Sequence, residues 1–131
     1  MEAKEAAKIG HIGLPAHSLA VFVRALSLPW VETIMFPYNI VENQGAELIH
    51  KCQEHNIGFI AMKPLAGGAI EDATLALRYI ASNPDVTVII PGMAEPHELE
   101  QNIAACSNHA PLTAEELKKL DEVRNLLGEN F

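Results

Sequence analysis

The stretch that decides the fold is Ile57-Gly58-Phe59-Ile60-Ala61-Met62-Lys63-Pro64-Leu65-Ala66-Gly67-Gly68. Its first six residues predict an apolar strand, and a loop rich in proline and glycine follows directly. A strand that ends in such a loop, with a helix after it, is typical of α/β proteins whose ligand site lies at the carboxyl ends of parallel strands. The same layout recurs where 32–36 leads into Pro37-Tyr38-Asn39 and where 86–90 leads into Pro91-Gly92.

The rest of the chain extends this layout into repeated strand and helix units. Strands are predicted at 8–14, 32–36, 57–62 and 86–90, so that their starts lie about 24 to 29 residues apart. Helices are predicted from Ser18 to before Pro29, at 45–55, at 71–81, from Pro96, and from a capping box that opens at Thr113. Units of this length pack as a parallel sheet with right-handed crossovers. The fourth strand is rich in β-branched residues, which predicts that both of its faces are covered.

Each predicted helix carries apolar residues at helical spacing, and we expect these residues to face the core. They are Leu19, Phe22, Val23 and Leu26 in the first helix, Leu48, Ile49 and Cys52 in the second, Leu75, Ala76, Tyr79 and Ile80 in the third, Leu99 and Ile103 in the fourth, which also carries the polar Asn102, and Leu117, Leu120, Val123 and Leu127 in the last. Cys52 and Cys106 have no metal-ligand spacing with the nearby histidines, and we interpret both as buried or half-buried thiols.

Length and charge narrow the class of protein. The 131 residues suffice for a single domain spanning 1–131, and the apolar fraction of 49% suits a globular core. No run reaches the ~18 apolar residues of a membrane span, and no secretory signal follows Met1, so we expect a cytoplasmic protein without a membrane partner. With 17 acidic and 9 basic residues the formal charge is -8. This balance argues against a nucleic-acid partner.

Several loop motifs together resemble the aldo-keto reductases, specifically their carboxyl-terminal half. The matching pieces, in chain order, are Ile12-Gly13 with His17-Ser18, Pro37-Tyr38-Asn39, Ala61 with Pro64-Leu65-Ala66-Gly67-Gly68, and Ile90-Pro91-Gly92 with Asn102. The resemblance implies half of a TIM (β/α)8 barrel: four parallel strand-helix units, numbers five to eight, plus a C-terminal helix. A full barrel typically takes ~250 residues, which is about twice this length.

The resemblance also implies a site for NADP or NAD along the carboxyl ends of the strands. Glycine-rich loops and helix amino-termini suit a pyrophosphate, because backbone amides can approach it closely. The cofactor-binding residues expected on this basis are Met62, Lys63, Pro64, Leu65, Gly67, Gly68, Pro91, Gly92, Met93 and Asn102.

Some positions depart from the family pattern. Pro15 and Ala16 stand where a Ser-Asn pair usually holds the nicotinamide carboxamide, and Met62 replaces an aromatic that often stacks on the ring. Gly92 and Glu98 occupy positions where basic residues often hold the 2′-phosphate of NADP. An acidic residue repels a phosphate, so NAD, or a different pose, is an alternative to NADP.

The family's catalytic tyrosine, lysine, aspartate and histidine belong to the first half of the barrel, so the resemblance implies no catalytic residue in this chain. We expect the cofactor-binding half of an NAD(P)H-dependent carbonyl reductase that is inactive alone. The alternative is a non-catalytic half-barrel that self-associates as a binding or assembly module. In either case open strand edges favour a homo-oligomer or a complementary N-terminal half as partner.

Overall fold

The computed structural model describes all residues from 1 to 131. In chain order the elements are α1 (Glu2–Glu5), β1 (Gly13–Pro15), α2 (Leu19–Leu26), β2 (Thr33–Pro37), α3 (Ala46–Glu54), β3 (Gly58–Met62), the 3-10 turn η1 (Ala66–Gly68), α4 (Ala73–Ala81), β4 (Val88–Ile89), α5 (Pro96–Ser107), α6 (Ala114–Leu127) and the 3-10 turn η2 (Gly128–Asn130). No helix has both the length and the apolar character that a membrane crossing requires.

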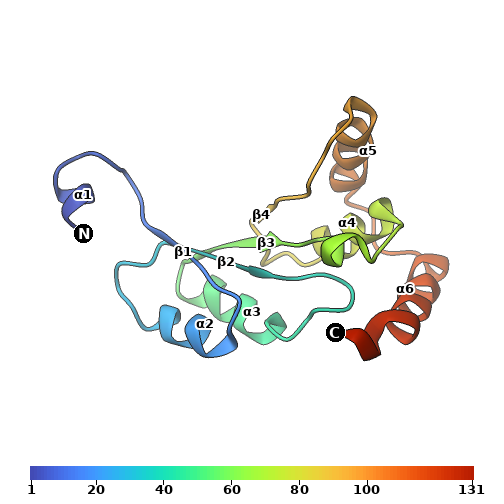
Figure 1. Cartoon of the computed structure of the whole chain (residues 1–131), viewed down its shortest axis with the longest axis horizontal. Helices are drawn as coiled ribbons and strands as arrows, with labels where there is room; N and C mark the ends of the chain where they lie inside the picture. Colours follow the sequence, from blue (N-terminus) through green and yellow to red (C-terminus); the bar gives the residue numbers. More distant parts are fainter.

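The four strands form one parallel sheet in the order β1-β2-β3-β4, which is also their order in the sequence. Helices α2 and α3 lie on one side of this sheet, and α5 and α6 lie beyond its far end (Figure 1). All four carboxyl ends therefore lie along one rim, because parallel strands end on the same side of a sheet.

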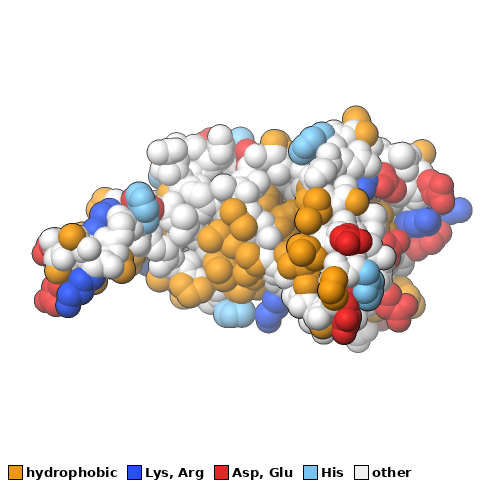
Figure 2. Space-filling view, turned by 90° about the horizontal axis from the view of Figure 1, so that it is seen from above, with side chains coloured by type: hydrophobic (Ala, Val, Ile, Leu, Met, Phe, Trp, Pro, Cys, Tyr) orange, Lys and Arg blue, Asp and Glu red, His pale blue; other side chains and the backbone are white.

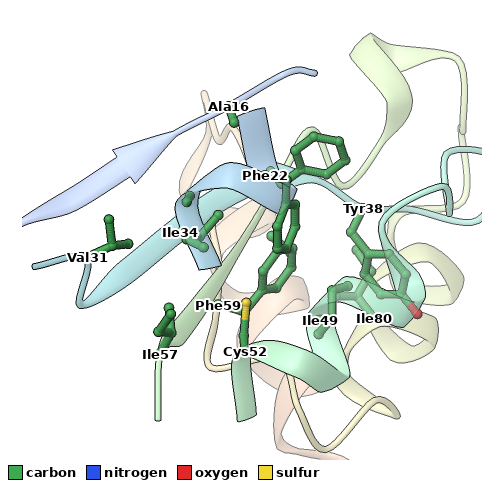
Figure 3. Packing of buried hydrophobic residues seen from close by; sticks show 13 residues of the cluster. Ala16, Phe22, Val31, Ile34, Tyr38, Ile49, Cys52, Ile57, Phe59 and Ile80 are labelled. Atoms are coloured by element: carbon green, nitrogen blue, oxygen red, sulfur yellow. The ribbon is translucent and has the colours of Figure 1, made fainter. Parts of the chain in front are cut away.

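The core lies between the sheet and its helices (Figure 3). Phe22 of α2 packs edge-on against Phe36 of β2, with ring centroids 5.0 Å apart, and stacks on Phe59 of β3 at 5.9 Å. Phe22 and Phe59 are fully buried. Truncating a buried phenylalanine to alanine costs about 3–5 kcal/mol, so these rings account for much of the packing energy between strand and helix.

A second cluster lies where α4 meets the C-terminal helix. Leu75 and Ala76 of α4 pack with Leu120 of α6, together with Ile40 and Ile70 from the loops at the rim. Because these side chains come from four separate segments, the cluster fixes α6 and two rim loops against α4.

The opposite face of the sheet is left uncovered by the chain. Side chains alternate along a strand, so the residues between the buried ones point away from the helices. A cross-strand row on that face consists of Pro15, Met35, Ile60 and Val88, which are in register. Met35 and Ile60 are only half-buried, and Pro15 and Val88 are exposed. Figure 2 views the molecule from this side, and hydrophobic side chains gather there along its middle.

Two predicted strands are shorter than expected. The first begins at Gly13 instead of Lys8, since the register with β2 begins at Gly13 and Thr33, and before it Ile12 bonds only to Glu32. The fourth comprises Val88 and Ile89 alone, and Val88 and Ile90 are 45% and 42% exposed. The prediction that both faces of this strand are covered is therefore wrong, because β4 is an edge strand on an uncovered sheet face.

Three helices also expose apolar residues that the sequence analysis assigned to the core. On α2, Leu19 and Val23 are 41% and 55% exposed, and on α5, Leu99 and Ile103 are 48% and 56% exposed. Leu117 of α6 is exposed as well. Helix α2 packs beside α3 and helix α5 packs beside α4, and the other flank of each apolar stripe meets solvent.

Candidate functional site

The rim loop after β3 has an unusual backbone. Lys63, the first residue past the strand, has a φ of 52°, and Ala66, Gly67 and Gly68 follow with φ values of 51°, 69° and 96°. Left-handed residues are rare outside glycine, and a run of them turns backbone amides toward one side, as in loops that bind anions. The sequence supplies glycine at two of these positions, which removes the steric cost there.

This loop and the loop after β4 enclose a cleft of about 350 Å³. It is lined by Lys63, Pro64, Leu65, Gly67, Gly68, Ile90 and Gly92. A Cβ atom placed on any of the three lining glycines would meet nothing within 4 Å, so the space above them is open to a ligand. The lining therefore combines one cation, an accessible backbone and a few apolar walls.

Lys63 supplies the positive charge of the cleft. Its side chain is exposed, and none of the ion pairs of the molecule includes it. A lysine ammonium with no carboxylate beside it can form a charge-assisted hydrogen bond to a phosphate. The geometry of the loop thus suits an anionic group.

The amino-terminus of α5 is already occupied by one of its own side chains. Glu98 Oε2 accepts hydrogen bonds from the backbone amides of Ala94 at 2.6 Å and Glu95 at 2.9 Å. These bonds, that of Glu95 first, lower the pKa of Glu98 below its ordinary value. The carboxylate is therefore ionised at neutral pH and adds negative charge beside the loop after β4.

Six of the ten residues predicted to bind cofactor line this one cleft: Lys63, Pro64, Leu65, Gly67, Gly68 and Gly92. The other four do not line it. Met62 is buried at the end of β3, Pro91 is half-buried beside the lining, Met93 is exposed, and Asn102 lies half-buried on α5. Ile90 lines the cleft but was missing from the prediction, although its place directly before Pro91-Gly92 was a usable signal.

The two tyrosines of the chain lie away from the cleft. Tyr38 belongs to the core cluster on the helix side of the sheet, and its hydroxyl oxygen lies 3.4 Å from that of Tyr79. Burial raises the pKa of Tyr38 to about 12, so its phenol stays protonated at neutral pH. Cys52 is buried and Cys106 is half-buried, as predicted, and both are free thiols.

A parallel sheet with sequential strand order, helices on one face and a ligand-type cleft at the carboxyl rim defines the chain as part of a (β/α) barrel protein. The aldo/keto reductase family profile matches residues 1–74 and 70–125. The chain belongs to the aldo/keto reductase family.

Individual relatives agree with this assignment. An uncharacterised oxidoreductase of Schizosaccharomyces pombe is 25% identical over 135 residues, which cover 91% of this chain and 44% of that protein. Among solved structures, an aldo-keto reductase of Bacillus halodurans in its holo form superposes with a TM-score of 0.77 at 20% identity, over 93% of this chain and 52% of that one. An aldo/keto reductase of Klebsiella pneumoniae, solved with NADP and acetate, gives a TM-score of 0.73 at 23% identity, over 93% and 50% of the two chains.

At these identities the likeness to solved structures concerns the fold. The chain spans about half the length of the relatives that it matches. The architecture is therefore half of the family's TIM barrel, with four parallel strand-helix units, as the sequence predicts.

Proposed function

We propose that this chain is the cofactor-binding half of an NAD(P)H-dependent carbonyl reductase, folded as one domain over residues 1–131. The observation that carries the proposal is the cleft at the ends of β3 and β4, where Lys63 and a left-handed glycine loop face the same open space. Family membership and NADP-bound neighbours of the same fold support it. Two free thiols suit the reducing cytoplasm, where we place the protein.

In this proposal the dinucleotide lies along the rim with its pyrophosphate against Lys63, Gly67 and Gly68. The lysine ammonium and the amide of Gly67 bind the phosphate oxygens, and Pro64 and Leu65 form the wall of the cleft. The amides of Ala66 and Gly68 donate within the turn, to the carbonyls of Lys63 and Leu65. Four predicted residues do not line the cleft. We propose that they contact the parts of the cofactor on either side of the pyrophosphate: Met62, Pro91, Met93 and Asn102. When bound, the nicotinamide supplies a hydride for reduction of a carbonyl.

The groups that deliver the proton are assigned to the other half of the barrel. Tyr38 is buried on the helix side of the sheet, and its raised pKa reflects burial. Neither it nor Tyr79 lines the cleft. The chain is therefore proposed to bind cofactor but to reduce no carbonyl without a complementary N-terminal half.

Titration of the chain with NADH and NADPH tests this function directly. Lys63→Ala should weaken dinucleotide binding roughly tenfold, because it removes a charge-assisted hydrogen bond to phosphate. The matched control is Lys51→Ala, an exposed lysine of α3, which should leave the affinity unchanged. Because Glu98 is ionised beside the loop after β4, we expect NADH to bind at least as tightly as NADPH. No saturable binding of either dinucleotide would refute the proposal.

A second candidate function, self-association as a binding or assembly module, is favoured by the uncovered sheet face. The row Pro15, Met35, Ile60 and Val88 is apolar along its whole width. The sheet also ends in two unpaired edges, β1 and β4. Unpaired edges and exposed apolar faces promote association.

The mass of the chain in solution separates the two candidates. If the chain is a module, sedimentation should show a stable oligomer whose mass and thermal midpoint do not respond to NADH or NADPH. If it is a cofactor-binding half, dinucleotide should raise the thermal midpoint. At a concentration of 100 times Kd, the free energy of unfolding should increase by about 2.7 kcal/mol. A monomer that ignores both dinucleotides would contradict both candidates.

A further inference from the structure

Two polar side chains are buried in the molecule, and Asn39 is the more deeply buried of them, with 0% exposure. It lies two residues past the end of β2, at the rim that carries the cleft. A polar group in such a place must satisfy its hydrogen bonds within the protein. The partners that it uses show what it does.

All the hydrogen-bonding capacity of the Asn39 amide is in use. Oδ1 accepts from the backbone amides of Val41 at 3.0 Å and Glu42 at 2.7 Å, which closes a local turn. Nδ2 donates to Glu42 Oε1 at 3.1 Å and to the backbone carbonyl of Lys63 at 2.9 Å. The turn needs only the acceptors, so the bond to Lys63 is a separate link between two rim loops.

The link ends on the residue with the first left-handed backbone of the cleft loop. Lys63 has a φ of 52°, a conformation that costs energy for any residue with a Cβ. Its carbonyl oxygen accepts from Asn39 Nδ2 and from the amide of Ala66 at 3.0 Å, so both lone pairs are engaged. The orientation of this peptide sets where the lysine side chain and the glycines after it lie.

We propose that Asn39 is a positioning residue for the cleft. It holds Lys63 in its left-handed conformation, and through it the turn that presents Gly67 and Gly68 to the ligand. The effect on a phosphate-containing ligand rests on the proposed function, whereas the effect on the loop does not. Asn39 itself does not line the cleft.

Asn39→Asp is the discriminating variant. The carboxylate retains the acceptor for Val41 and Glu42 but has no hydrogen to donate to the Lys63 carbonyl or to Glu42 Oε1. The variant is therefore made in the Glu42→Gln background, where no second carboxylate repels it. In the full chain, NMR hydrogen exchange at the amides of Ala66 and Gly68 should become at least tenfold faster, and NADH affinity should fall about tenfold. Glu42→Gln is the matched control, because it removes a charge but keeps the oxygen that Asn39 Nδ2 contacts, and it should change neither quantity.

A second variant addresses the strain itself. Glycine adopts a positive φ without steric cost, so Lys63→Gly should make the link from Asn39 less necessary. The drop in thermal midpoint caused by Asn39→Asp should be at least halved in the Lys63→Gly background. If Asn39→Asp alone does not fold, its combination with Lys63→Gly should fold.

The outcomes are separable. Wild-type exchange rates at Ala66 and Gly68 in a folded Asn39→Asp protein, equal drops in both backgrounds, or a combination with Lys63→Gly that also fails to fold would each overturn the positioning role. Exchange needs no ligand, so faster exchange supports the role even where NADH does not bind. Absence of NADH binding to the unmodified chain would instead refute the proposed function.

Discussion

At the scale of single residues, Arg78 joins three parts of the chain. Its guanidinium makes a bidentate pair with the carboxylate of Glu116, at 2.6 and 3.0 Å, and donates to the backbone carbonyls of Asn108, Ala110 and Pro111. Arg78 is 5% exposed. These bonds hold the segment between α5 and α6 against α4, in a geometry that favours arginine over lysine.

The same pair makes the stability of the fold depend on pH. The hydrogen bond from Arg78, and next that from the Thr113 amide, lower the pKa of Glu116 from 4.5 to about 2. A depressed carboxyl pKa contributes stability above the unfolded value, and this contribution is lost as pH falls toward the folded value. Urea unfolding should therefore show Glu116→Gln to be less stable than the unmodified chain at pH 7, with the difference shrinking between about pH 4.5 and 2.

Glu115→Gln is the control for this measurement, since Glu115 neighbours Glu116 but is exposed and pairs only with Lys119 on the same helix. It should have little effect at any pH. A deficit of Glu116→Gln that stays constant from pH 7 to pH 2 would show that the ionised pair is not its source.

At the scale of elements, helix α5 has one face that packs against the protein and another that is exposed to solvent. Ala105 is buried, and α5 packs on α4, while Leu99 and Ile103 are exposed on another face. Figure 1 shows α5 standing away from the sheet. An apolar stripe of this kind on a helix at the end of the sheet is suited to contact with a further element that this chain does not supply.

The stripe gives a prediction about association. Replacing Leu99 and Ile103 together by lysine should change the free energy of unfolding of the monomer by no more than about 0.5 kcal/mol per site, because both side chains are exposed. The same change should weaken any oligomer, as measured by sedimentation at several concentrations. Gln101→Lys adds charge to an exposed position of the same helix and should leave the mass unchanged. Equal masses for the stripe variant and this control would remove α5 from the interface.

The elements also show what the sequence could and could not predict. The strand 57–62 and its glycine loop were predictable because apolar runs, proline and glycine act locally. The brevity of β4 and the exposed stripe of α5 were not, because burial there depends on which distant elements of the fold pack beside them. The bond from Asn39 to Lys63 joins residues 24 positions apart, and no local pattern signals it.

At the scale of the whole molecule, the fold is half of a closed architecture. The sheet has four strands, and helices cover only one of its faces. The solved structures with the same fold are about twice as long. The cleft that we assign to a dinucleotide lies entirely within this half. Under the function proposed above, cofactor binding and proton delivery are divided between two sets of strand-helix units.

The sequential order of the strands has a consequence for how the protein is made. Each strand pairs with the one that left the ribosome just before it, so no strand must wait for a distant segment to be translated. Folding begins on the N-terminal side during synthesis, and joining two segments close in sequence loses less chain entropy than joining distant ones. During translation the sheet can therefore be extended by one strand-helix unit at a time, in the order of the sequence.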